Sequence, residues 1–285
     1  MEFRTAIHIP GNHLFTDHVL QCVKDAGFDA VALGFYADGA RYLREDNWRD
    51  AVLRIREKLE QYGLPCVQTH LPCYEIRRSS DEPCEEEAVL IERGIEATAM
   101  LGCRWGAWHP RTDFNHDFDR KNGIRDNVRE LQRFVKTAEK FDVGIAVENL
   151  PVFPDCRNIL FFSSRYEDLI EVVDTLDSPH IGITWDTGHA HLMRNLFSQG
   201  DAIRAAGSRI KILHLNNNFG NADVHTPLAI GGIDWHEVMG ALSDIGFDGC
   251  FTTELSTPYD VPEVLRSIMI HHGESARWLQ KFLPR

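Results

Sequence analysis

Eight short apolar runs recur along the chain, and each is predicted to be a β-strand. Each run is rich in β-branched or aromatic residues, or is bounded by Gly and Pro. Several are apolar at consecutive positions, which is typical of strands buried on both faces. The predicted strands are Thr5–Ile9, Ala30–Phe35, Pro65–Leu71, Arg104–His109, Gly144–Asn149, Ile181–Asp186, Ile210–Leu215 and Cys250–Leu255.

Between these runs, apolar residues recur at spacings of three and four, which predicts amphipathic helices. Gly27, Gly63 and Gly246 each follow such a segment and are expected to close it. Asp234 is expected to cap the start of another. The predicted helices are Asp17–Ala26, Trp48–Tyr62, Glu85–Leu101, Arg125–Phe141, Tyr166–Leu176, Leu196–Ala206, Trp235–Ile245 and Val261–Phe282.

Eight successive strand–helix units, without a long linker or a break in composition, predict an α/β fold: a single-domain (β/α)8 TIM barrel spanning residues 1–285. The length fits, since such barrels have about 250 residues. The loops after the third, fourth and fifth strands are the longest, and we expect them to form a lid or a pocket wall.

Composition narrows the expected partners and cellular location of the protein. The net charge is −13, which argues against broad nucleic-acid binding, so nucleic acid is not the expected partner. The sequence shows neither a signal peptide nor a membrane span. Its seven cysteines include no Cys-x-x-Cys pair and are expected to be reduced, buried thiols of a cytoplasmic protein. Whether the chain forms a homo-oligomer is left open.

Metal-competent side chains follow the predicted strands. In barrels of this kind, active sites lie at the carboxyl ends of the strands. Most of the apolar runs stop at a His, Asp or Glu, so we expect these side chains to meet at one mouth. The nine candidates are His70, His109, Glu148, Asp186, His189, His214, Asp223, His225 and Glu254.

A divalent metal ion explains this pattern better than nine separate structural roles. A lone histidine at a strand end is more often a hydrogen-bonded structural residue than a ligand. An ionised carboxylate in an apolar strand, such as Glu148, is costly to bury unless a cation lies nearby. Carboxylates together with imidazoles suit Mn²⁺, Mg²⁺, Co²⁺ or Zn²⁺. His271 and His272 lie within a predicted helix, and we assign them no metal role.

The chain resembles the xylose isomerase-like TIM barrel superfamily, within its sugar phosphate isomerase/epimerase group. The resemblance spans nearly the whole chain and is most specific from the fifth strand to the eighth. The segments that carry it are Val147–Asn149, Trp185–His189, Leu213–Asn217, Asp223–His225, Gly231–Trp235 and Ile245–Glu254.

The resemblance implies a single metal ion and a defined chemistry. By position, the metal ligands are Glu148, Asp186, His214 and Glu254, with His189 beside the metal and His70 facing the substrate. The implied reaction isomerises or epimerises a sugar, sugar phosphate or cyclitol, by abstracting a proton α to a carbonyl through a metal-stabilised enediolate. Glu148 and Glu254 are then the acid/base pair. Dehydration of a polyol would use the same groups.

One departure from the epimerase sequence pattern raises an alternative function. Many epimerases carry an arginine shortly after the strand-seven histidine, but here that stretch, residues 216–221, has none. The chain adds His109 and the Asp223-Val-His225 motif instead. All nine candidates then match the ligands of type IV apurinic endonucleases, which share this barrel and use three zinc ions. The alternative is therefore an endonuclease IV-like trinuclear-zinc phosphodiesterase acting on abasic DNA.

The sugar enzyme is favoured for three reasons. The segment Pro227–Trp235 resembles the sugar-enzyme group in its spacing. The charge balance is acidic, and no basic loop interleaved with aromatic residues is evident for gripping a flipped-out DNA site. Arg77 and Arg78 are the nearest basic pair. Gly231 and Gly232 could offer N–H groups to a phosphate, although the turn into the next helix is the favoured reason for them. The substrate, the metal and the choice among isomerase, epimerase and dehydratase stay open.

Overall fold

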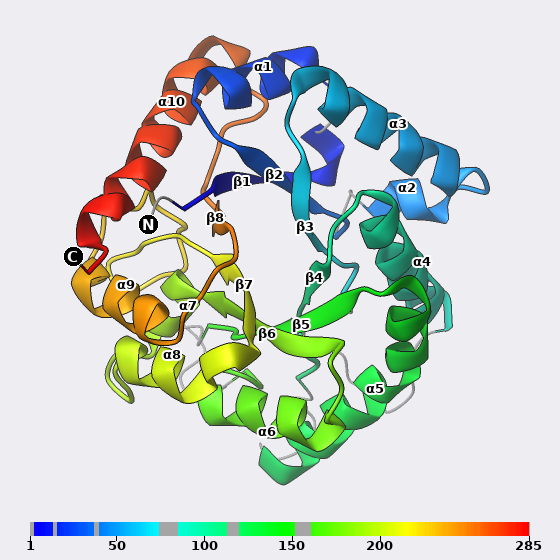
Figure 1. Ribbon diagram of the computed structural model, residues 1–285, viewed down its shortest axis with the longest axis vertical. Helices are drawn as coiled ribbons and strands as arrows, with labels where there is room; N and C mark the ends of the chain where they lie inside the picture. Colours follow the sequence, from blue (N-terminus) through cyan, green and yellow to red (C-terminus); the bar gives the residue numbers. More distant parts are fainter. Residues whose placement is uncertain are drawn as a thin grey trace.

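The computed structural model describes residues 3–13, 16–36, 40–73, 85–112, 120–151 and 161–284. Eight parallel strands surround a central axis, and the helices form a ring outside them (Figure 1). The strands pair in the order β7-β6-β5-β4-β3-β2-β1-β8. Leu215, just after β7, closes the ring by bonding to the backbone of Thr252 and Glu254. The predicted (β/α)8 barrel is confirmed.

The strands lie where the apolar runs predict, and most are shorter than predicted by a residue or more. The largest shortening is at β8, which keeps only three residues of the predicted Cys250–Leu255. The strands are β1 Thr5–Pro10, β2 Ala30–Gly34, β3 Cys66–His70, β4 Trp105–Trp108, β5 Gly144–Glu148, β6 Ile181–Asp186, β7 Ile210–His214 and β8 Phe251–Thr253.

The predicted helices are also present, with two corrections at their starts and two short helices that were not predicted, α2 and α7. Short 3₁₀ turns follow β1, precede β7 and follow α10, the last at Leu279–Phe282. The helices are α1 Asp17–Asp25, α2 Arg41–Arg44, α3 Trp48–Tyr62, α4 Glu85–Met100, α5 Arg120–Phe141, α6 Tyr166–Leu176, α7 Thr187–Leu192, α8 Gln199–Ala206, α9 Trp235–Asp244 and α10 Pro262–Trp278.

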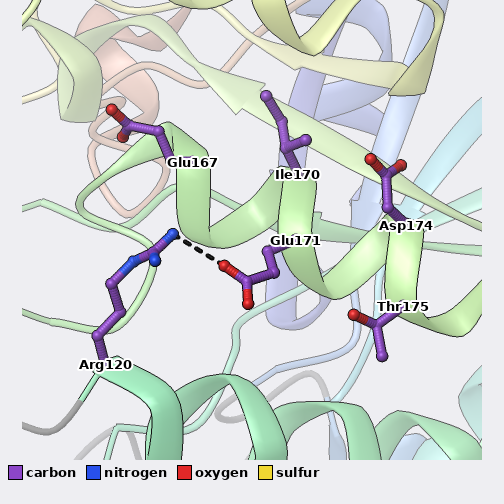
Figure 2. Close-up of a pocket in the computed structure, with 6 residues that line it drawn as sticks. All are labelled: Arg120, Glu167, Ile170, Glu171, Asp174 and Thr175. Atoms are coloured by element: carbon purple, nitrogen blue, oxygen red, sulfur yellow. Dashed lines mark ion pairs between the residues drawn. The ribbon is translucent and has the colours of Figure 1, made fainter.

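Both corrections have local causes. Helix α5 begins at Arg120 rather than Arg125, because Arg120 forms ion pairs with α6. It pairs with buried Asp168 and, at 3.1 Å, with Glu171, as Figure 2 shows. Helix α8 begins after Leu196, because the Ser198 hydroxyl accepts a hydrogen bond from the backbone N–H of the third residue after it and so caps the helix.

Inside the barrel, uncharged side chains, both apolar and polar, form a layer beneath the mouth. Inward positions alternate along each strand, so the residue two places before each strand-end candidate lies one layer below it. The side chains of this layer are all buried, and they are Ala6, Gln68, Ala107, Ala146, Thr184, Ile212 and Thr252. This layer separates the carboxyl-end mouth of the barrel from its amino end.

Some predictions fall outside the described residues. Arg77, Arg78, Cys84 and Cys156 are among them, as is much of the three long loops. The five described cysteines are free thiols, and three of them are buried. Within the described part of the chain, no helix combines the length and the hydropathy needed to cross a membrane.

Candidate active site at the carboxyl ends of the strands

The structure brings the nine predicted residues to one end of the barrel. His70, Glu148, Asp186 and His214 are the last residues of β3, β5, β6 and β7. His109 and Glu254 directly follow β4 and β8, His189 lies in α7, and Asp223 and His225 lie after β7. Eight of the nine, all but Asp223, form three groups of potential metal ligands that share members: Glu148, Asp186, His214 and Glu254; His70, His109 and Glu148; and Asp186, His189 and His225.

The central group is the largest of the three, with four members. One ligand atom from each of its four residues lies within 4.8 Å of those of the others. His214 Nδ1 is 3.1 Å from Glu148 Oε1 and 3.3 Å from Glu254 Oε2. Except for Glu254, whose side chain is 16% exposed, the group is sealed from solvent. The four ligands that the family resemblance implies therefore do converge.

The two flanking groups lie on either side of this centre. His70 Nε2 and His109 Nε2 are hydrogen-bonded at 3.1 Å, and they lie 3.6 and 3.4 Å from Glu148 Oε2. On the other side, Asp223 bridges two imidazoles, since its oxygens are 3.3 Å from His189 Nε2 and 3.2 Å from His225 Nε2. Every predicted residue is thus in the cluster.

The protonation of the centre follows from its crowding. Burial would raise the pKa of Glu148, but His214 and His109 outweigh it and hold that pKa well below its usual range. In the same way, burial is outweighed at Glu254, where His214 and His8 lower the pKa to about 2. Against burial, Glu148 and Glu254 raise the pKa of His214 to about 9. Among the described residues, only histidines form ion pairs with these two glutamates.

The donor atoms fit a divalent cation. Glu148 Oε2, His214 Nδ1 and Asp223 Oδ1 are buried yet have no hydrogen-bond partner in the described chain. Buried polar atoms seldom lack a partner. Ligands about 2.1 Å from a tetrahedrally coordinated ion lie about 3.4 Å apart, close to the spacing of His214 Nδ1 from the two glutamates. A shared metal ion would satisfy these atoms.

Asp186 is held by the chain around it. It caps α7, because its Oδ1 accepts the backbone N–H of His189 at 2.7 Å. Its Oδ2 accepts from Asn216 Nδ2 at 2.7 Å, and Asn149 is hydrogen-bonded to its backbone on both sides. Burial raises the pKa of Asp186 to about 6. The same contacts aim His189, whose Nδ1 is hydrogen-bonded to the carbonyl of Asn149 at 2.8 Å.

Sequence reasoning missed His8 and Tyr36 in this site, and also Asn216, which donates to Asp186. His8 Nδ1 lies 3.6 Å from Glu254 Oε1, and burial lowers the pKa of His8 to about 4. Tyr36 stacks on His8 and meets His70 edge-on, with ring centroids 5.7 and 4.6 Å apart. The alternation of β1 was a usable signal, because it points His8 inward.

The glycine pair after β7 makes a tight turn. The N–H of Gly232 is already bonded to the carbonyl of Asn218 at 2.8 Å. Gly231 has φ of 151°, and a Cβ there would lie 2.2 Å from the Asn217 side chain. Gly232 therefore has no free N–H for a phosphate, and the turn explains the pair.

Comparison with known proteins places the chain among barrels of this kind. Residues 20–282 match the family described as the xylose isomerase-like TIM barrel. An uncharacterised protein of Methanocaldococcus jannaschii is 33% identical over 238 residues, which are 82% of this chain and 77% of that protein. A D-psicose 3-epimerase of Enterocloster bolteae is 32% identical over 245 residues, 81% of this chain and 74% of the relative.

A solved structure agrees with the fold. The crystal structure of a D-tagatose 3-epimerase-like protein matches with a TM-score of 0.70 over 94% of this chain and 97% of its own. Its sequence identity is 23%, so the likeness concerns the fold alone.

Proposed function

The chain belongs to the xylose isomerase-like TIM barrel family, and we propose that it is a metal-dependent isomerase or epimerase of a sugar, a sugar phosphate or a cyclitol. The observation that carries this proposal is the convergence of Glu148, Asp186, His214 and Glu254 on one point. The similarity to a D-psicose 3-epimerase favours a ketose among the possible substrates.

These four residues would hold the metal ion. When bound, a divalent cation supplies positive charge beside the substrate's carbonyl oxygen, which makes the adjacent C–H more acidic. His70, His109 and His189 line the approach to it and would bind substrate hydroxyl groups. His70 Nδ1 is hydrogen-bonded to the backbone carbonyl of Leu71 at 3.0 Å, which leaves Nε2 facing the site.

Glu148 and Glu254 are the proposed acid/base pair. Each has one oxygen toward His214, 3.1 and 3.3 Å away. The second oxygen of each faces a different histidine: Glu148 Oε2 lies 3.4 Å from His109 Nε2, and Glu254 Oε1 lies 3.6 Å from His8 Nδ1. One oxygen can therefore bind the metal while the other accepts or returns the substrate proton.

Proton exchange with solvent tests this assignment. Protein loaded with Mn²⁺ or Co²⁺ is incubated in D₂O with D-psicose, D-tagatose or D-fructose, and the C–H beside the carbonyl is followed by NMR. We expect exchange with the wild type and a loss of about a hundredfold or more in Glu254→Gln. Glu263→Gln, exposed at the start of α10, is the matched control. Metal content is measured for each variant, and exchange retained by a metal-loaded Glu254→Gln removes Glu254 from the pair.

The three ligand groups favour one second candidate. They are joined through Glu148 and Asp186, which each belong to two groups, and such sharing suits a trinuclear zinc phosphodiesterase acting on abasic DNA. Three tightly bound zinc ions per chain, together with cleavage of an abasic-site duplex, would establish it in place of the isomerase. About one metal per chain and no cleavage would exclude it.

The proposal also covers the domain organisation, the binding partner and the cellular location. Residues 1–285 form one domain, and the partner is a small sugar-like molecule rather than nucleic acid. The enzyme acts in the cytoplasm, in keeping with its free cysteines. Limited proteolysis tests whether the chain forms one domain, and cell fractionation tests the cytoplasmic location.

A further inference from the structure

A cavity lies at the amino end of the barrel, opposite the candidate active site. Its volume is about 830 Å³. Its lining comes from the segments that enter the strands, including Phe3 and Arg4 before β1, Trp105 at the start of β4, Lys211 in β7 and Phe251 at the start of β8. None of the nine candidate residues lines it, so it has no part in the proposed reaction.

Aromatic rings form flat walls in this amino-end cavity. The Trp105 indole lies across the starts of the two neighbouring strands, where Gly144 and Gly182 leave room for it: a Cβ at these positions would lie 2.1 and 3.2 Å from the ring. Phe3 and Phe251 are stacked, with centroids 3.9 Å apart and planes 20° apart. Such surfaces suit a planar apolar ring.

The charged residues around the cavity are mostly cations. Arg104 is neutralised by Asp142 at 2.5 Å, but Arg4 and Lys211 have no carboxylate within 4 Å in the described part of the chain. Lys211 Nζ lies 5.7 Å from the centre of the Trp105 ring. Among the described residues that line the cavity, Asp248 is the one carboxylate. This excess of positive charge around the cavity favours an anionic ligand.

A buried amide at the inner end of the cavity lacks a partner. Gln68 is 4% exposed and lines the cavity. Its Oε1 accepts a hydrogen bond from the Thr252 hydroxyl at 3.0 Å across the barrel, while its Nε2 has no partner among the described residues. An unsatisfied buried donor costs about 1–3 kcal/mol. An acceptor oxygen of a ligand would remove that cost.

We propose that the amino-end cavity binds a small planar aromatic carboxylate that carries a second oxygen. The ring lies against Trp105, the carboxylate meets Arg4 and Lys211, and the second oxygen accepts from Gln68 Nε2. A carboxylate facing two cations forms charge-assisted hydrogen bonds, and stacking beside the indole adds apolar contact. This site is independent of the proposed sugar chemistry.

Calorimetric titration of the full chain with 6-hydroxy-2-naphthoate tests the proposal. We expect saturable binding that weakens about tenfold or more in Lys211→Met and in Arg4→Met, since each loses one charge-assisted contact. Gln68→Leu should also weaken it. Lys24→Met, exposed on α1 and remote from the lining, should bind as the wild type does.

Two further titrations test whether the carboxylate is needed for binding and at which end of the barrel the probe binds. Naphthalene-2,6-diol keeps the ring but lacks the charge, and we expect its binding to the wild type to be at least tenfold weaker. His214→Ala, which disrupts the opposite end, should bind 6-hydroxy-2-naphthoate normally. The proposal is overturned by no binding to the wild type, by equal binding of the diol, by unchanged binding in both cation variants, or by lost binding in a folded His214→Ala.

Discussion

Asn216→Ala tests whether hydrogen bonding around Asp186 prepares it to bind the metal. Asn216 Nδ2 donates to Asp186 Oδ2, and the N–H of His189 donates to Oδ1, each at 2.7 Å. The two bonds fix the carboxylate, and all three residues are buried. A hydrogen bond to a charged acceptor contributes about 1.5–3 kcal/mol. Its loss should lower metal affinity about ten- to hundredfold, as for other groups that orient metal ligands.

The assay is calorimetric titration of metal-free protein with Mn²⁺ or Zn²⁺. Asn218→Ala is the matched control, because Asn218 is equally buried in the same segment but donates to the carbonyl of Gly188 at 2.9 Å rather than to a carboxylate. Urea unfolding of both variants establishes that each is folded. Equal metal affinity for Asn216→Ala and the wild type, or an equal loss in Asn218→Ala, would refute the reasoning.

Stability is expected to depend on the burial of His272 and on the packing at two glycines, Gly144 and Gly240. Burial lowers the pKa of His272 to about 4 from 6.5, so between these pH values the unfolded chain binds the extra proton and stability rises with pH. The wild type should therefore lose up to about 3 kcal/mol of stability through His272 between pH 7 and 4, and His272→Leu should not show this part of the loss. Urea unfolding measures it, and the same pH slope in both proteins would contradict the prediction. Gly144→Ala should cost about 1–3 kcal/mol, because its Cβ would meet Trp105 at 2.1 Å. Gly240→Ala, with nothing within 4 Å, should stabilise α9 by up to about 1 kcal/mol, and equal urea midpoints for the two variants would count against the packing argument.

The candidate ligands could be predicted because the barrel imposes a simple rule. Parallel strands of one barrel all end at the same mouth, so a side chain that ends a strand lies near the others whatever its neighbours are. Glu148 and His214 come from strands that are not adjacent, yet their atoms lie 3.1 Å apart. Their proximity could be predicted from the strand ends alone, without interatomic distances or protonation states.

The missed residues lack that signal. His8 is followed by Ile9 and Pro10 within β1, so it does not mark a strand end. Asn216 is not itself a candidate ligand, and its role depends on a hydrogen bond to Asp186 that only the folded chain shows. Helix α7 is six residues long, too short for a 3.6-residue period to be recognised. The local sequence pattern therefore predicts strand ends, whereas contacts between distant segments become visible only in the folded structure.

The number of divalent ions held tightly by each chain tests the central claim most directly. Protein purified without chelator is dialysed, and its metal is counted by mass spectrometry against the protein concentration. The account predicts about one ion per chain, with the tight ion lost in Asp186→Ala, since Asp186 belongs to the central group. Three tight ions per chain would contradict a single-metal isomerase, and no tight ion in the wild type would contradict the metal site itself.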